Sequence, residues 1–458
     1  MSQHRAGIGA VAGGLLALGT LAWIVPMASG SGTAAGEGAD GGDVVGRELF
    51  LREWIADDPR AHDGDGLGPV YNDTSCVACH NLGGPGGGGP ATKNVELLTA
   101  PAEADAIDLV NLARVHRGFR GSRSVVLHQF GTDREYDTWR WTLLGHPPRE
   151  RARLLPTIFN DRETDRAEDE IARINVRMGP LARLLDRGVR FGGTRLLLSR
   201  RNPPPLFGTG LIDAIPDAAI EAGAKRQDDF PEVHGRVSRL KGGRIGRFGW
   251  KAQIPDLREF VFTACANELG LEVPDHHQAI HPLNPEAQAK GFDLTADECE
   301  RLVAFVRGLR GPEPAPTVGD TDAILEAGRD AFATAGCVAC HLPKLGPVEG
   351  VYSDLLLHDM GRELSDAGSY YSIAGPDSPG LALAQEWRTP PLWGFRDSGP
   401  YLHDGRARTL DEAVAQHGGE ATASAVRYFK LPPKGRQLIQ TFLRSLAVPA
   451  QVLPARAD

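Results

Sequence analysis

The sequence predicts a mainly α-helical chain with extensive loops, built from two tandem units of which the first carries large insertions. A five-residue pattern occurs twice, at Cys76–His80 and at Cys337–His341. An amphipathic segment with apolar residues at helical spacing follows each pattern, at 297–309 and at 435–446. The 56 glycines and 33 prolines make up about a fifth of the 458 residues, against a usual share of about 12%. Ordered loops therefore account for much of the chain.

Length and charge exclude several classes of protein. A chain of 458 residues is long enough for two or three domains with a real core. Its net charge of −9 disfavours nucleic acid as a partner, because phosphate binding needs a basic surface. The 24% charged and 41% hydrophobic residues are ordinary for a globular protein. Neither a disordered chain nor a polytopic membrane protein fits this composition.

The N-terminal region predicts export from the cytoplasm. Arg5 precedes a charge-free stretch from Ala6 to Gly30, which is typical of a signal peptide or a single N-terminal membrane anchor, so we assign residues 1–30 to it. Residues 31–43 are nearly all Gly, Ala, Ser, Asp and Glu and predict a flexible linker. We therefore expect a periplasmic or other extracytoplasmic protein, either free or tethered to the inner membrane.

The repeated pattern is C-x-x-C-H, and it determines the predicted chemistry. This spacing lets two thiols form thioethers to the vinyl groups of one haem while the adjacent histidine binds the iron. A zinc knuckle or a thioredoxin-like pair is the alternative, but both copies carry the immediate histidine and neither follows a predicted strand. The sequence therefore predicts two covalently bound haem c groups, the first held by Cys76, Cys79 and His80 and the second by Cys337, Cys340 and His341.

Two further cysteines remain, Cys265 and Cys299. They fall in helix-like segments at 257–269 and 296–309. In an oxidising compartment a leftover pair most simply forms a disulfide, with two buried free thiols as the alternative.

An internal duplication surrounds the two motifs. A linker at 311–316, rich in proline, separates the copies and predicts two cytochrome c-like domains, at 44–311 and 317–449. Paired segments flank the motifs in the same order: Gly46–Phe50 with Gly328–Phe332 before them, and Arg201–Gly208 with Arg388–Gly394 after them.

Several of these segments carry a family resemblance. Arg388–Leu392, Pro400–Gly405 and Thr409–Val414 resemble the bacterial di-haem cytochrome c peroxidase/MauG superfamily. Gly208–Pro216 and Gly246–Ala252 are similar to its di-haem oxidoreductase branch. The resemblance extends over nearly everything after the linker, and it implies an enzyme of the peroxidase type in which one haem passes electrons and the other meets the oxidant.

The resemblance also indicates the axial ligands of the second haem. In the superfamily the second ligand lies on the helix after the His-Asp-Gly loop, as Met in the peroxidases and Tyr in MauG-like proteins. The matching position here is His417, which predicts a six-coordinate electron-transfer haem between His341 and His417. Met360 is the alternative ligand, and His417 would then only cap its helix.

The same alignment predicts an open first haem. The His-Asp-Gly loop is missing after Gly208, and Gly223 falls opposite His417. Glycine cannot bind iron, so His80 would be the only protein ligand unless an insertion supplies another. His128 and His116 lie in the insertion and are candidates for that ligand or for a distal acid–base. A hydrogen-bonded structural role is the alternative for both.

Three other features complete the predicted site. Trp250 is a candidate electron relay between the haems, because an indole can be transiently oxidised, with a core aromatic as the alternative. The glycine run at 83–89 predicts close approach of backbone to the porphyrin. His276, His277 and His281 lie in a loop bounded by prolines, and we expect them at the surface.

These inferences predict an exported di-haem oxidoreductase that reduces hydrogen peroxide at the first haem. Electrons would come through the second haem from a small redox protein or a quinol-linked donor, and His80, His128 and Trp250 would be the catalytic residues. The alternative is a non-enzymatic di-haem electron-transfer cytochrome. Oxidation of a partner protein's side chains, as in MauG, is disfavoured by His rather than Tyr at position 417.

Overall fold

A computed structural model describes residues 43–447 except 102–103, 105, 145–166, 186–187, 192–193, 226–229, 312–318, 320, 367 and 369–381. Gly42–Asp458 forms one compact unit, separate from Met1–Gly41. The predicted export segment, nearly all of the linker at 31–43 and most of the linker at 311–316 lie outside the described residues. Among the helices that are described, none is long and apolar enough to cross a membrane.

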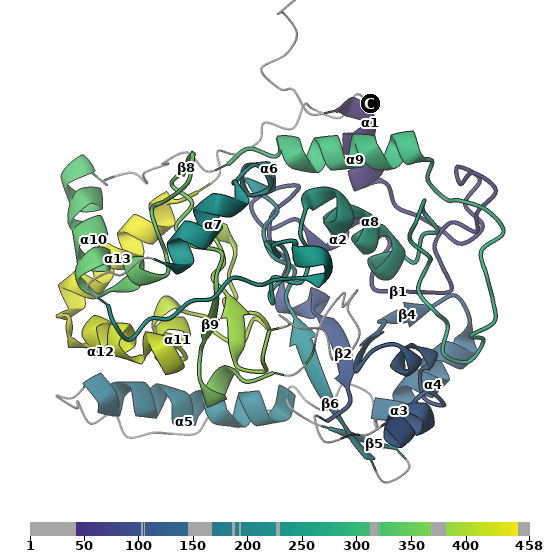
Figure 1. Cartoon of the computed structure of the whole chain (residues 1–458), viewed down its shortest axis with the longest axis horizontal. Coiled ribbons are helices and arrows are strands. Elements are labelled where there is room, and N and C mark those ends of the chain that lie inside the picture. Colours follow the sequence, from purple (N-terminus) through teal and green to yellow (C-terminus); the bar gives the residue numbers. More distant parts are fainter. Residues whose placement is uncertain are drawn as a thin grey trace, which may run out of the picture. The chain divides into compact units, whose positions relative to one another are not determined.

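Helices dominate the described chain and are joined by long loops (Figure 1). Short 3-10 turns, including η5 (Cys337–Ala339), add to them. The α-helices are α1 (Val44–Leu51), α2 (Cys76–Cys79), α3 (Ala106–Leu112), α4 (Arg134–Leu144), α5 (Ala167–Leu185), α6 (Thr209–Asp213), α7 (Asp217–Ala224), α8 (Leu257–Glu268), α9 (Ala296–Gly308), α10 (Asp322–Thr334), α11 (Leu410–Ala415), α12 (Thr422–Lys430) and α13 (Pro433–Ser445).

Short antiparallel sheets complete the secondary structure. The larger sheet has the strand order β3-β2-β6-β5, and the other strands pair as β1-β4, β9-β10 and β7-β8. The strands are β1 (Val70–Tyr71), β2 (Val95–Thr99), β3 (Ser124–Leu127), β4 (Phe130–Gly131), β5 (Val189–Phe191), β6 (Thr194–Arg201), β7 (Lys344–Leu345), β8 (Val348–Glu349), β9 (Leu357–Asp359) and β10 (Glu386–Arg388).

The four-stranded sheet is built from the segment between the first C-x-x-C-H motif and the proline-rich turn at 203–205. Its two middle strands, β2 and β6, pair over their length, and a small core that includes Leu98, Phe119 and Leu196 lies against the sheet. This insertion was expected as an enlargement of the first unit. The sheet itself was not predicted, because its strands are short and far apart in sequence.

The N-terminal caps explain why the helices begin where they do. Thr295 and Glu298 form a reciprocal capping box at the start of α9. The carboxylate of Asp256 accepts a hydrogen bond from Glu259 N at the start of α8, and the hydroxyl of Thr321 does the same for Ile324 N in α10. The caps of α8 and α9 place these two helices within a residue of the segments predicted at 257–269 and 296–309.

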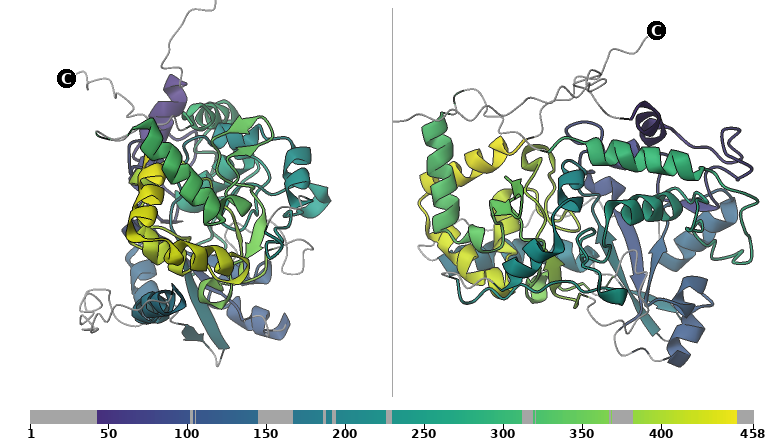
Figure 2. Two further views of the ribbon diagram at one scale, coloured as in Figure 1. Left: turned by 90° about the vertical axis from the view of Figure 1, so that its left-hand side faces the viewer. Right: turned by 45° about the horizontal axis from the view of Figure 1, so that its top comes forward.

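Both halves of the chain repeat one helix crossing. In the first, α1 packs on α9, and in the second, α10 packs on α13 (Figures 1 and 2). A Cβ on Gly46 would lie 2.0 Å from Arg301 O, and one on Gly328 would lie 2.4 Å from Leu438 O. Only glycine lets the backbones come this close, which explains why the duplicated segments both begin with it.

The duplicated phenylalanines complete each crossing. Phe50 packs at a tilt against Phe305 with ring centroids 5.2 Å apart, and Phe332 meets Phe442 edge-on at 5.6 Å. The two copies thus use the same residue types for the same contact. The predicted boundaries at 44–311 and 317–449 stay a prediction, because Gly42–Asp458 clusters as one compact unit.

Helix α5 comes from the first half of the sequence but packs on α11 and α12 of the second (Figure 1). Its Ile174 and Met178 are buried in the same hydrophobic cluster as Tyr428, Phe429 and Phe442. The core of the second half therefore includes a helix from the first.

Two sequence-based expectations are wrong. Cys265 and Cys299 are free, buried thiols on the neighbouring helices α8 and α9 and form no disulfide. Compartment and an even number of cysteines favoured the bond, but a disulfide also needs a geometry that the sequence does not report. His281 is only 4% exposed rather than at the surface, because its ring packs on Tyr136 at 5.6 Å. His276 is half-buried and His277 is exposed.

Candidate functional site

Each C-x-x-C-H motif folds as a single helical turn. In the first, Ser75 caps α2 by accepting a hydrogen bond from Ala78 N, and His80 N donates to Cys76 O at 3.0 Å. In the second, His341 N donates to Cys337 O at 2.9 Å across η5. One turn brings residues i and i+3 to the same side, so both cysteines of a motif lie near each other with the histidine just beyond.

Backbone carbonyls fix the two motif histidines. His80 Nδ1 lies 3.2 Å from Gly87 O and 3.1 Å from Pro204 O, and His341 Nδ1 donates to Tyr352 O at 2.9 Å. Because Nδ1 carries the proton, Nε2 is the nitrogen left with a lone pair. Burial lowers the pKa of each histidine to about 4, which keeps both imidazoles neutral and able to bind a metal.

The glycine run beside His80 holds that ring in place. A Cβ on Gly87 would lie 1.8 Å from Leu82 O, and one on Gly89 would lie 2.5 Å from Cys79 O. The run therefore lets the chain fold tightly over its own motif and present Gly87 O to His80.

One cavity surrounds the first motif, and a second cavity surrounds the other motif. Apolar side chains make up most of both walls. Polar and charged groups beside the first motif are Asp73, Arg201, Asn202 and Glu268, and those beside the second are His358, Arg388, His403 and His417.

The second cavity contains both predicted candidates for a further axial ligand, His417 and Met360. His417 Nδ1 donates to Ala413 O at 2.8 Å, which leaves Nε2 unprotonated as in the motif histidines. A charge on His417 would further lower the pKa of His341, so the two imidazoles lie near each other.

The first cavity has a different lining. Among the described residues that line it, His80 is the only histidine and there is no methionine. Its helical walls come from α8 and α9, through residues such as Val261 and Val306. Gly223, which the duplication places opposite His417, does not line this cavity, because α7 packs on β7 instead.

Trp250 lies between the two cavities and lines both of them. Its indole Nε1 donates to Asn202 O at 2.9 Å, and its own carbonyl accepts from Arg388 N at 3.0 Å. The tryptophan thus connects to the proline-rich segment of each half. This is the position that a relay between two cofactors would need.

The structure does not bring His128 or His116 to the first cavity. His128 Nε2 donates to Asn267 O at 2.8 Å, and burial lowers its pKa to about 3. His116 Nδ1 accepts a hydrogen bond from Gly118 N at 3.1 Å within the insertion. This geometry favours the structural role for both histidines.

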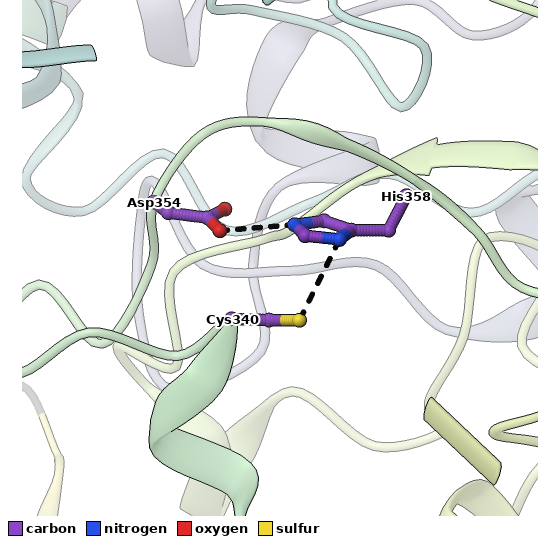
Figure 3. A group of neighbouring side chains, drawn as sticks. All are labelled: Cys340, Asp354 and His358. Atoms are coloured by element: carbon purple, nitrogen blue, oxygen red, sulfur yellow. Dashed lines mark hydrogen bonds and ion pairs between the residues drawn. The ribbon is translucent and has the colours of Figure 1, made fainter. Parts of the chain in front are cut away.

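Cys340, Asp354 and His358 form a cluster at the edge of the second cavity (Figure 3). His358 Nε2 lies 2.9 Å from Asp354 Oδ2, and its Nδ1 lies 2.8 Å from Glu420 Oε2. With a carboxylate at each nitrogen, the pKa of His358 is raised well above 6.5 by Asp354, Cys340 and Glu420 against the effect of burial. A doubly protonated imidazole is not a metal ligand, so the cluster is an ion-pair network.

Sequence reasoning missed several charged residues of the cavity walls. Glu268, from α8, and Arg201 line the first cavity, and Arg388 lines the second. The duplication could have pointed to the two arginines, because they occupy equivalent positions of the paired proline-rich segments. Nothing in the sequence connects Glu268 to His80, since only the folding of α8 brings them to one cavity.

The donor set fits a haem in each cavity. Each has two thiols on one helical turn, a neutral histidine with a free Nε2 and a largely apolar wall. Burial raises the pKa of Cys76 and Cys337 to about 12, so these thiols stay protonated. Fold and site together define a helical di-haem protein. The family model for "Di-haem oxidoreductase, putative peroxidase" matches residues 180–446, and the chain belongs to this family.

Individual relatives support the same superfamily. The methylamine utilization protein MauG of Methylorubrum extorquens is 32% identical over 166 residues, which are 33% of this chain and 44% of that protein. The hydrazine synthase subunit gamma of Kuenenia stuttgartiensis is 25% identical over 199 residues, 38% of this chain and 54% of that one. The chain therefore spans about half the length of the curated relatives it matches.

Among solved structures, the diheme peroxidase BthA of Burkholderia thailandensis is similar. The match has 15% sequence identity and a TM-score of 0.33, and it covers 60% of this chain and 79% of that one.

Proposed function

We propose that this di-haem oxidoreductase reduces hydrogen peroxide in the first cavity with electrons that pass through the second. The proposal rests on one observation, which is that the two cavities differ in the side chains able to bind iron. The second cavity has His417 and Met360 in addition to His341, whereas the described lining of the first has no histidine besides His80 and no methionine. One iron would be closed by two protein ligands and the other left open.

In this proposal Cys76 and Cys79 hold the first haem as thioethers, and Cys337 and Cys340 hold the second. A haem with an open iron position supplies peroxide binding and oxidation–reduction chemistry when bound. The Nε2 atoms of His80 and His341 would bind the irons, since the Nδ1 atoms of both rings are bonded to backbone carbonyls. We assign His417 rather than Met360 as the second ligand in the second cavity, because its Nε2 is left free in the same way.

Trp250 is the proposed relay for electrons between the cavities. It lines both, and its indole is held by a hydrogen bond to Asn202 O at 2.9 Å. A fixed ring reorganises little when it loses or gains an electron, which favours transfer through it.

Reduction of one hydrogen peroxide to two waters consumes two electrons and two protons, so the first cavity needs a group that moves protons. We assign this role to Glu268. Its Oε2 accepts a hydrogen bond from Asn72 Nδ2 at 2.7 Å, which orients the carboxylate at the cavity wall. Asp73, the other carboxylate of the wall, is committed to an ion pair with Lys93.

Electrons would come from a small redox protein or a quinol-linked donor outside the cytoplasm, where c-type haem is attached. The second candidate is an electron-transfer cytochrome without catalysis, in which both irons would have two protein ligands.

Absorption and electron paramagnetic resonance spectra of the purified holoprotein discriminate between the peroxide-reducing enzyme and the electron-transfer cytochrome. The proposal expects two covalent haems by mass, and a high-spin fraction that changes on addition of peroxide or cyanide. Wholly low-spin haem that responds to neither ligand, in the oxidised and half-reduced protein alike, would establish the electron-transfer cytochrome instead.

A further inference from the structure

Arg388 is a buried cation without an ion-pair partner among the residues that the structure describes. It is the last residue of β10, only 7% exposed, and it lines the second cavity. Its Nε donates to Gly249 O at 2.8 Å and its Nη1 to Thr389 O at 3.3 Å. Within the described residues, no carboxylate lies within ion-pairing distance of it, and Nη2 has no hydrogen-bond acceptor.

A nearby acidic group compensates this charge only in part. Asp354 acts on Arg388 electrostatically, but its Oδ2 bonds to His358 at 2.9 Å and its Oδ1 accepts from Leu356 N at 3.0 Å. Burial lowers the pKa of Arg388 to about 10, which reflects this incomplete compensation. A buried, unpaired guanidinium is costly, so such a group normally has an anionic partner.

The equivalent arginine of the first half has a protein partner. Arg201 lines the first cavity, and its Nη1 lies 2.7 Å from Asp366 Oδ2. Both aligned arginines therefore lie beside a cavity, but within the described part of the chain Arg201 alone of the two has a carboxylate partner. This difference between the two arginines indicates that a ligand bound in the second cavity supplies a carboxylate to Arg388.

We propose that Arg388 binds a propionate carboxylate of the haem in the second cavity and thereby raises the reduction potential of that haem. The inference rests on the proposed function, in that it takes the second cavity to hold a haem, and it adds the residue that sets the driving force for electron transfer. A guanidinium matches a carboxylate in shape and charge, and neutralising a propionate favours the reduced iron.

Arg388 also contacts the loop that contains Trp250. Through Nε it holds Gly249 O, and its own N–H donates to Trp250 O at 3.0 Å. The residue that would bind the propionate is therefore bonded directly to the loop that carries the proposed relay.

The test is a spectroelectrochemical titration of the holoprotein that follows the low-spin haem, together with resonance Raman bands of the propionate bending modes. Arg388→Gln should lower the equilibrium constant for reduction of this haem about tenfold, which for one electron lowers the reduction potential by about 59 mV. It should also shift the propionate band. Arg388→Lys keeps the charge and should retain most of the potential. Lys434→Gln removes an exposed lysine at the start of α13 and is the charge-matched control.

An unchanged potential in Arg388→Gln overturns the proposal, and so does a lower potential with an unshifted propionate band, because the charge would then act only through space. If Arg388→Gln fails to fold, a crystal structure of the wild-type holoprotein tests whether Arg388 contacts the propionate. Nη2 should lie within about 3 Å of a propionate oxygen, and a propionate turned away from it is the contrary result. If the second haem accepts no electrons from any donor, the proposed function is wrong. The contact between Arg388 and the propionate would still stand.

Discussion

Gln416 Nε2 donates a hydrogen bond to Asn175 Oδ1 at 2.6 Å, which ties the inserted helix α5 to the residue next to His417. Arg436 of α13 adds an ion pair to Glu170 of α5 at 2.8 Å. The proposed ligand of the second haem is therefore held by a helix that belongs to the other half of the sequence.

This contact predicts that weakening α5 loosens the second haem site. Ile174→Ala should lower the free energy of unfolding by about 2–5 kcal/mol, because Ile174 is buried in the core of the second half. It should also raise the high-spin fraction of the second haem. Val176→Ala, on the same helix but 60% exposed, is the control and should stay within about 0.5 kcal/mol. Chemical denaturation and paramagnetic resonance measure both effects, and equal behaviour of the two variants would contradict the role of α5.

His417→Gly should convert the second haem from low spin to high spin, since it removes the imidazole whose Nε2 is free to bind. Met360→Leu removes the rival side chain from the same cavity and should leave the spectrum unchanged. The reverse pattern would assign Met360 as the ligand. Absorption and paramagnetic resonance spectra at one pH make the comparison.

Trp250→Phe should slow electron transfer between the haems at least tenfold, because phenylalanine is harder to oxidise and loses the hydrogen bond to Asn202. Trp393→Phe is a close control. Trp393 also donates its indole N–H to a backbone carbonyl, Gly350 O at 2.6 Å, but it lines only the second cavity. Stopped-flow mixing of the reduced protein with peroxide reports the rate, and equal rates in both variants would exclude Trp250 as the relay.

Glu268→Gln should slow the reaction with peroxide by about 10²–10⁴, the usual contribution of a positioned acid–base group, while the haem content stays the same. Glutamine keeps the size of the side chain and an acceptor for Asn72. Glu326→Gln, on the exposed side of α10, is the control. A rate within twofold of wild type for Glu268→Gln would remove it from the mechanism.

His358→Gln should destabilise the holoprotein by about 3–5 kcal/mol, because Asp354 and Glu420 would lose the cation between them. The pKa of His358 is raised in the folded state, so its contribution is complete below about 6.5 and is lost as the pH rises through the higher folded value. The difference between wild type and variant should therefore be constant near pH 6 and shrink in alkaline solution. Urea titrations across this range test the trend, with the exposed His277→Gln as control; a difference that grows with pH would contradict the assignment.

Some parts of the fold and site follow from sequence because covalent or steric rules fix them locally. The C-x-x-C-H motifs set their own helical turn, and the glycines at 46 and 328 mark the helix crossings. His417 could be proposed because the family resemblance gives the position of the second ligand, on the helix after the His-Asp-Gly loop. Trp250 was a candidate from its residue type, and the cavities on both sides of it now give that choice a geometric basis.

Other parts depend on contacts between distant segments. Glu268 reaches the first cavity only through the packing of α8, and no local pattern marks it. The disulfide between Cys265 and Cys299 was inferred from cysteine number and compartment, neither of which describes how two helices orient their thiols. His128 was proposed for its chemistry alone, and the carbonyl of Asn267 occupies the nitrogen that catalysis would have needed.

The place of α5 has a consequence for biosynthesis. Its apolar face, with Ile174 and Met178, leaves the ribosome long before Tyr428 and Phe429, which cover it in the finished protein. Until Tyr428 and Phe429 are synthesised, this apolar face is exposed. Transiently exposed apolar surface favours misfolding and aggregation. A chain that stops between the two halves would never cover it, and a C-terminal fragment made alone would lack part of its own core. Although the sequence carries a repeated pattern, the second half therefore depends on the first for part of its core.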